Sequence, residues 1–236
     1  MKNLSKLIVL LLLTTLTSCV VSGVKGSKNV TTENRIIKSD FDGIKVSMGI
    51  LVELTQAKEV SVEAEMDDNI HELLITEVKD GILHIYFDEQ VGHCKQKTVR
   101  LSMPTIAQLK ASSGARIKGQ DKIKTTELEL NTSSGGGIKL DIETTRIDCN
   151  ASSGASMTLE GICKNSYTNA SSGSNIDASK LESVTAKATV SSGANIKVYA
   201  SNSIDANASS GGSVYCEGSP EQKSINKSSG GSVHVE

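Results

Sequence analysis

Apolar and polar positions alternate along most of the chain, and in its second half the alternation is tied to a recurring tripeptide. Ser-Ser-Gly occurs seven times, with its glycine at Gly114, Gly135, Gly154, Gly173, Gly193, Gly211 and Gly230. The third residue after each glycine is Ile, Met or Val, and the residues between the apolar positions are mostly polar. A period of two predicts strands that turn one face inward.

The tripeptide recurs at steps of 21, 19, 19, 20, 18 and 19 residues, which is typical of a solenoid. One repeat of this length cannot bury its own apolar face, whereas stacked repeats share a continuous core. The pattern predicts an all-β fold, a parallel β-helix or β-solenoid, with about seven coils and one Ser-Ser-Gly corner per coil. Small residues directly after the glycines indicate a tight turn or close packing there.

An asparagine column accompanies these corners. Four residues before the glycine stand Asn131, Asn150, Asn169, Asn207 and Asn226. Stacked amides hydrogen-bond to the coils above and below, so we interpret the asparagine and serine columns as structural ladders.

Residues 35–105 lack the tripeptide but keep the alternation, for example at Ile44, Val46 and Met48. Asp80-Gly81 stands between two apolar runs and is a strong hairpin signal. We expect an irregular, β-rich N-terminal cap that is continuous with the solenoid of residues 106–236. An uncovered solenoid end would be a template for aggregation.

The first eighteen residues have the organisation of a signal peptide. Lys2 and Lys6 flank an apolar run, residues 7–13, that is too short to span a membrane. Residues 16–19 resemble the lipobox of bacterial lipoproteins, in which the cysteine, here Cys19, is lipidated. The alternative is a plain secretory signal. Residues 19–34 are expected to form a tether, and Val20 favours the outer membrane, with the periplasmic or surface face left open.

Two copies of the repeat, residues 170–176 and 190–196, read Ala-Ser-Ser-Gly-Ser-Asn-Ile and Val-Ser-Ser-Gly-Ala-Asn-Ile. Together with Phe41-Asp42-Gly43-Ile44-Lys45-Val46 and Val99-Arg100-Leu101-Ser102-Met103-Pro104, they resemble the head GIN domain family of auto-transporter adhesins, common in Bacteroidetes lipoproteins. The resemblance covers about residues 35–236. It implies a β-solenoid at the cell envelope and brings no established catalytic residues.

Charge argues against nucleic acid as a partner. The whole chain has 25 basic and 27 acidic side chains. Removal of residues 1–18 deletes Lys2 and Lys6, which leaves 25 − 2 = 23 basic side chains against 27 acidic ones, a net charge of −4. A polybasic surface is therefore not expected.

Parallel β-helices include polysaccharide lyases and hydrolases, whose catalysis requires paired carboxylates or a carboxylate set with a basic residue. Glu129 and Asp148, each six residues before a glycine, fall on neighbouring coils about 5 Å apart, a separation compatible with a retaining glycosidase. Arg146 lies two residues from Asp148, and the column is otherwise mixed. We interpret it as a solvated charged face and expect no catalytic residue.

The cysteines offer little chemistry. His93-Cys94 lacks partners at metal-ligand spacing, so neither a metal nor a cofactor is expected. Cys149 and Cys216 fall in inward columns and are interpreted as small core residues. A disulfide between Cys149 and Cys163 stays open.

In the last repeat, Lys223 and Lys227 occupy columns that are apolar or small elsewhere. Inward lysines disfavour docking of a further strand, so end-to-end stacking through the C-terminal coil is not expected. The sequence thus predicts a lipid-anchored, non-enzymatic envelope protein that serves adhesion or scaffolding. The alternative is a polysaccharide-active β-helix enzyme, a lyase or glycosidase. The ligand and the oligomeric state stay open.

Overall fold

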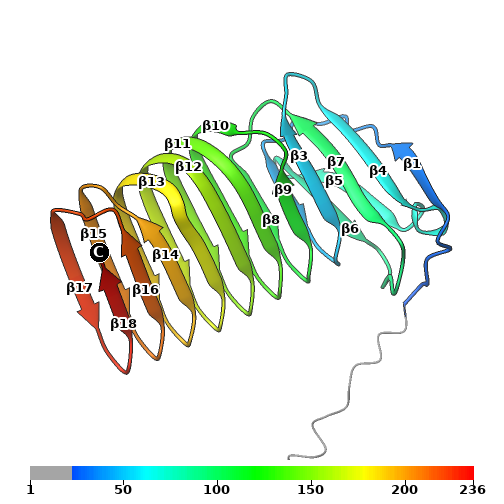
Figure 1. Ribbon diagram of the computed structural model, residues 1–236. Coiled ribbons are helices and arrows are strands. Elements are labelled where there is room, and N and C mark those ends of the chain that lie inside the picture. Colours follow the sequence, from blue (N-terminus) through cyan, green and yellow to red (C-terminus); the bar gives the residue numbers. More distant parts are fainter. Residues whose placement is uncertain (1–22) are drawn as a thin grey trace, which may run out of the picture.

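The computed structural model describes residues 23–236, which form a flattened β-solenoid whose coils lie in a row (Figure 1). The expected signal peptide and Cys19 lie outside the described residues. Two columns of strands enclose the core. We call the strands that precede the tight corners sheet A and those that follow them sheet B. Apart from the short 3-10 turn η1 (Asp68–Ile70), the described residues contain no helix. None of these residues therefore forms a helix long and apolar enough to cross a membrane.

The strands divide between the sheets as follows. Sheet A contains β2 (Gly43–Val46), β5 (Leu74–Lys79), β6 (Ile82–Phe87), β8 (Gln108–Ala111), β15 (Ser203–Ala208) and β17 (Gln222–Lys227). Sheet B contains β1 (Val30–Asn34), β3 (Leu51–Gln56), β4 (Ser61–Asp67), β7 (Lys97–Met103), β9 (Arg116–Gly119), β14 (Asn195–Tyr199), β16 (Ser213–Glu217) and β18 (Ser232–Val235). Four longer strands cross from sheet B to sheet A, namely β10 (Ile123–Thr132), β11 (Gly137–Ala151), β12 (Ser156–Ala170) and β13 (Asn175–Val190).

The seven Ser-Ser-Gly corners are confirmed as tight turns, and they follow one edge of the stack in Figure 1. In each corner the second serine has φ between 46° and 53° and the glycine φ between 68° and 76°. The N–H of the next residue donates to the first serine's carbonyl at 2.8 to 3.2 Å. Two positive φ values and this bond define a type I′ turn. Each of the first six glycines also donates to the second serine of the next coil at 3.1 or 3.2 Å.

An eighth tight corner precedes these seven. Met48 (φ 62°) and Gly49 (φ 72°) join β2 to β3, and Gly49 N donates to Ser113 O at 3.0 Å. Methionine in place of the second serine hides this corner from a search for the tripeptide.

The opposite, wide corner is built differently. Thr125, Thr144 and Cys163 are in register, and each side chain donates to the carbonyl two residues later at 3.1 Å. The unequal repeat lengths are absorbed on this side. The longest step has its two extra residues between Lys118 and Ile123, and the 20-residue step has its extra residue in a bulge opposite Thr158 and Glu160.

The N-terminal end does not follow chain order. The coil β2–β3 lies between β6–β7 on one side and β8–β9 on the other, in parallel pairing with both. Antiparallel strands then close the stack, with β5 on β6, β4 on β7 and β1 on β4. The expected hairpin at Asp80-Gly81 joins β5 to β6. The expectation of a tether over residues 19–34 is corrected at its end, because Val30–Asn34 forms β1.

The core runs through the whole stack. Phe87 and Met66 are fully buried near the N-terminal end, and Leu130, Ile142 and Met157 are fully buried in the later coils. Small buried side chains such as Ala188 and Ala206 fill part of the C-terminal coils. Cys94, Cys149, Cys163 and Cys216 are free, so the disulfide left open between Cys149 and Cys163 is absent from the structure.

Candidate binding groove on sheet A

A shallow groove of about 540 Å³ follows the outer face of sheet A beside the tight corners. We call it the polar groove. Its walls come from two outward columns: Lys45, Lys110, Asn131, Asn150, Asn169 and Thr189, and the first serines of five corners, Ser112, Ser133, Ser152, Ser171 and Ser191. Between these columns the inward residues are small, with Ala111, Thr132, Ala151 and Ala170 at the floor. Short side chains beside the corner leave the surface hollow.

The asparagine column is in register, as the repeat predicts. Asn169 Nδ2 donates to Asn150 Oδ1 at 3.1 Å, and Asn226 Nδ2 donates to Asn207 Oδ1 at 3.0 Å. Thr189 separates the two pairs, and Asn131 donates to Glu129 instead, at 2.7 Å. A side-chain amide has two donor hydrogens and an acceptor oxygen, so each amide keeps hydrogen-bonding capacity toward the solvent side.

The column continues past the first Ser-Ser-Gly coil. Asn131 is in register with Lys110, Lys110 with Lys45, and Lys45 with His84. The polar groove is thus neutral along the asparagines and cationic at its N-terminal end. Lys110 shares the asparagine position relative to its glycine, which the sequence shows. Lys45 is 65 residues earlier, and only the register brings it there.

Glu129 and Asp148 are neighbours, as expected, but both carboxylates are engaged. Glu129 accepts hydrogen bonds from Gln108 Nε2 at 2.5 Å and from Asn131. Asp148 is held in a two-point ion pair by Arg146, with Nε–Oδ2 2.8 Å and Nη2–Oδ1 3.1 Å. The Asp148 carboxylate raises the pKa of Arg146, whose guanidinium also lies 4.2 Å from the ring centre of Tyr167. These contacts describe a charged face bonded across coils.

A further hollow of about 370 Å³ lies on the same sheet toward the C-terminal end. Tyr167, Lys187, Asp205 and Lys223 are among its lining residues. Lys187 Nζ lies 3.3 Å from Asp205 Oδ2, so part of its charge is neutralised in place.

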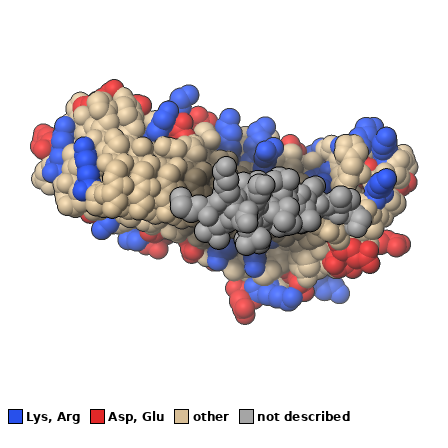
Figure 2. Space-filling model, turned by 90° about the horizontal axis from the view of Figure 1, so that it is seen from below, with Lys and Arg blue, Asp and Glu red and all other residues tan. Residues whose placement is uncertain are grey.

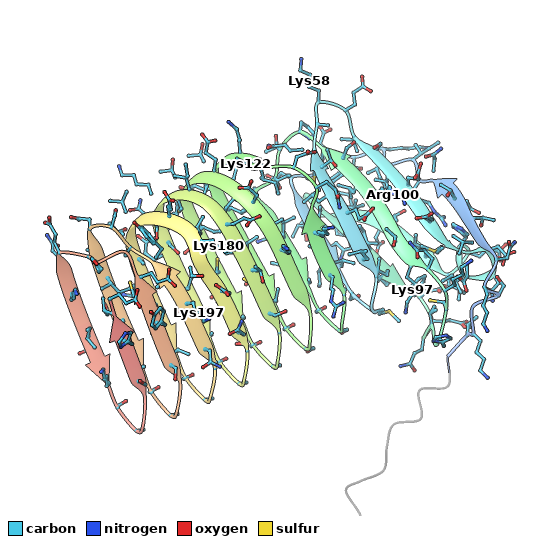
Figure 3. All side chains as sticks on the ribbon, in the orientation of Figure 1. Lys58, Lys97, Arg100, Lys122, Lys180 and Lys197 are labelled. Atoms are coloured by element: carbon cyan, nitrogen blue, oxygen red, sulfur yellow. The ribbon has the colours of Figure 1, made fainter. Side chains whose placement is uncertain are left out.

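Sheet B differs in its electrostatics. Arg100 on β7, labelled in Figure 3, lies within 2.6 to 3.3 Å of the carboxylates of Glu53, Glu63 and Glu65. These carboxylates raise the pKa of Arg100, the hydrogen bonds from Glu63 and Glu65 being the main cause. The view onto the corners in Figure 2 shows a largely uncharged surface over the C-terminal coils, with charges toward its margins.

The buried cysteines of residues 23–236 are interpreted as core residues rather than reactive ones. Burial raises the pKa of the Cys149 thiol, and burial raises that of Cys163 to about 11, so both thiols stay protonated at neutral pH. Cys94 is partly buried against the core. Within residues 23–236, no group of three His, Cys, Asp or Glu side chains lies close enough to hold a metal ion.

Residues 40–220 match the sequence profile of the family described as "Putative auto-transporter adhesin, head GIN domain". None of the curated proteins matches the chain.

Several solved structures share the fold. An adhesin, described as putative, from Bacteroides fragilis has a TM-score of 0.84 and 22% identity, over 91% of this chain and all of that one. A protein from Parabacteroides distasonis described as a "putative lipid binding protein" has a TM-score of 0.71 and 22% identity, over 90% of this chain and 99% of that one. A "putative adhesin" from Parabacteroides merdae has a TM-score of 0.72 and 19% identity, over 90% of this chain and 98% of that one.

Proposed function

Because the chain belongs to the head GIN domain family of auto-transporter adhesins, we propose that it is a non-enzymatic adhesin of the cell envelope that binds an extended polymer in the polar groove. The family's description supports adhesion and association with the envelope. The extent of the polar groove supports a binding role for it, because it is the hollow on sheet A that extends over the most coils.

The observation that carries this proposal is the regular wall of the polar groove. Asn131, Asn150 and Asn169 present amides at successive coils, about 4.8 Å apart. Their backbones are paired on both sides within the stack, so the spacing is rigid. Rigid donors and acceptors at a fixed repeat suit a polymer with its own repeat, because little entropy is lost on binding.

The alternative, a polysaccharide-active enzyme, receives no support from the same sheet. A glycosidase needs one carboxyl group that donates a proton and a second that attacks or activates water. Glu129 and Asp148 are instead engaged by Gln108, Asn131 and Arg146. Arg146 pairs with both oxygens of Asp148, which leaves neither of them free to act on a substrate.

Groove binding is tested with a bulky side chain. Asn169→Trp places a large ring in the polar groove. Thr158→Trp places the same ring on the exposed face of sheet B from the same strand, β12. Immobilised protein is assayed for retention of polysaccharide released from the producing cells. We expect the groove variant to lose retention while the control keeps it, with both variants folded by circular dichroism. Equal retention by both variants would remove the groove from the proposal.

We further propose that lipid on Cys19 anchors the protein to the outer membrane, on its periplasmic or surface face. Support comes from the resemblance of residues 16–19 to a lipobox. Cys19→Ala should move the protein from the membrane fraction to the soluble fraction. Unchanged fractionation would contradict the lipid anchor without affecting the groove.

We also propose that the C-terminal coil resists end-to-end stacking. Lys223 pairs with the buried Ile204 and Lys227 with the buried Ala208, yet every residue of β17 is exposed. Charges in these columns oppose the docking of another strand. Replacement of both lysines with valine should produce oligomers that grow with concentration in light scattering. A double variant as monomeric as the parent would refute this.

A further inference from the structure

We infer that the polar groove takes a glycan with spaced acidic sugars, and that Lys45 and Lys110 together bind one acidic group of that glycan. The inference rests on the proposed groove function and adds the chemistry of the ligand and its position. Three features carry it: an unneutralised pair of lysines, a neutral remainder of the groove, and the absence of an open strand edge.

The first feature is the lysine pair. Lys45 and Lys110 are direct parallel neighbours, so their side chains start about 4.8 Å apart and repel each other. Within residues 23–236, no carboxylate lies within ion-pair distance of either ammonium. Lys122, Lys124 and Lys187 differ in this respect, because each contacts a carboxylate of the adjacent coil, at 3.5, 3.0 and 3.3 Å. Lys118 and Lys139 are also direct neighbours, but they lie on sheet B, so the position in the polar groove distinguishes Lys45 and Lys110.

The neighbouring strands do not neutralise the two lysines. His84 on β6 follows Lys45 in the same column. Burial lowers the pKa of His84, and the charges of Lys45 and Lys79 lower it further. Glu77, across from His84 on β5, is occupied by Lys79 and Tyr86, with hydrogen bonds of 2.6 and 2.7 Å. An acidic group at Lys45 and Lys110 would therefore meet two cations and relieve their mutual repulsion.

The second feature limits how many charges the ligand carries. Beyond Lys110 the column continues as Asn131, Asn150, Asn169 and Thr189, all uncharged. A nucleic acid, with a phosphate at every unit, requires a row of cations, which this groove lacks. Amides and hydroxyls instead match the hydroxyl groups of neutral sugars, and the alanines of the floor offer carbon contacts for ring faces. A glycan in which acidic sugars alternate with neutral ones fits this distribution.

The third feature disfavours a peptide. An extended peptide binds a β-fold by adding a strand to an open edge, or by placing side chains in apolar pockets. The strands under the polar groove are interior members of sheet A, paired on both sides. Apart from the small floor residues, the groove's lining is polar. With strand addition and apolar pockets both disfavoured, the groove can recognise a ligand by side-chain hydrogen bonds and one charged contact. Glycans are bound by contacts of this kind.

The test uses calorimetry with three hexasaccharides. Hyaluronan carries a carboxylate on alternate sugars, chondroitin sulfate carries carboxylate and sulfate, and chitohexaose is neutral. We expect both acidic probes to bind more tightly than chitohexaose. Preference for chondroitin sulfate over hyaluronan would identify sulfate as the favoured group, whereas equal binding would identify the carboxylate.

The variants separate the groove from general attraction. Lys45→Gln with Lys110→Gln should weaken binding of the acidic probes about tenfold or more, since a charged hydrogen bond is lost. Lys118→Gln with Lys139→Gln makes the same charge change at an adjacent lysine pair on sheet B, where both lysines are exposed. This control should bind like the parent protein.

Several results would overturn the inference: no binding by either acidic probe, chitohexaose binding as tight as hyaluronan, or equal losses in the two double variants. Its failure is separable from that of the proposed function. If Asn169→Trp abolishes polysaccharide retention while Lys45→Gln with Lys110→Gln leaves it unchanged, the groove binds a polymer but not through an acidic group.

Discussion

The two corners of each coil reverse the chain by different physical means. The tight corner depends on backbone conformation, because its second serine and its glycine both have positive φ. In β11 and β12 the wide corner keeps a strand backbone, and a buried hydroxyl or thiol donates to a nearby carbonyl, at Thr144 and Cys163. Only the first device requires one residue type at a fixed position.

This difference explains where the repeats vary in length. A type I′ turn has two central residues and cannot accept a third without changing type. At the wide corner, a side chain can donate to a carbonyl even when the preceding strand is longer by one or two residues. The extra residues of the longer repeats therefore lie between sheet B and the wide corner. The tight corners therefore keep the coils in register, and the wide corners absorb the variation.

The largest effect is expected in β12, beside the wide corner and next to the bulge of β13. Gly161 has φ 115°, and a Cβ there would overlap the carbonyl oxygen of Ile142. Gly161→Ala should destabilise the protein by about 3 kcal/mol, because strain and overlap combine. Gly137→Ala is the control, since a Cβ at Gly137 meets nothing closer than 3.5 Å and its φ is not positive. Equal free energies of unfolding for the two variants in urea denaturation would contradict the special role of Gly161.

The next effect is expected at the tight corners. Gly154 has φ 69°, and a Cβ there would find nothing within 4 Å, so only conformation opposes a side chain. Gly154→Val should cost about 2 kcal/mol, since β-branched residues are rarely found at positive φ. Ser156→Val, on an exposed strand position nearby, should change the melting temperature little. Unaltered stability of Gly154→Val would mean that glycine is not needed for the turn.

A smaller loss is expected at the wide corner. Thr144 Oγ1 lies 3.1 Å from the carbonyl oxygens of both Thr126 and Arg146. Thr144→Val keeps the shape but leaves these carbonyls without that donor, which should cost about 1–2 kcal/mol in urea denaturation. Thr144→Ser keeps the hydroxyl and should retain more stability than Thr144→Val. The reverse order would show that packing, not hydrogen bonding, fixes this corner.

The fold was largely predictable because its main signal is local. Three adjacent residues, Ser-Ser-Gly, specify the tight corner, so its seven copies indicate both the stacked coils and the length of the repeat. The corner at Met48-Gly49 was not predicted, because methionine stands where the other corners have their second serine. The turn depends on the positive φ of that residue and not on its side chain. The wide corner was also not predicted. Thr, Cys and Ser each supply a hydrogen-bond donor there, but they are different residue types and so form no sequence motif.

The site was predictable only in part. The asparagine column follows from the repeat, and the structure confirms its register. The cationic end depends on Lys45, which pairs with Lys110 only because the coil β2–β3 lies between two later segments of the chain. Such an order has no local signal, because the pairing partners are distant in sequence.

The smallest effect concerns the second serine of the corner, where conformation and surface can be separated. Ser153 has φ 52° and is exposed, and asparagine is better suited than serine to the first central position of a type I′ turn. Ser153→Asn should therefore leave stability unchanged or raise it by up to about 0.5 kcal/mol.

All seven corners nevertheless carry serine at this position. If Ser153→Asn and the equivalent change at Ser172 raise the melting temperature, the turn does not explain the choice of serine. The small size of the serine side chain on the exposed corner surface would then be the reason to keep it there. If asparagine destabilises the protein instead, stacking against the next coil limits the corner, and the comparison of the two corners must include contacts between side chains as well as backbone conformation.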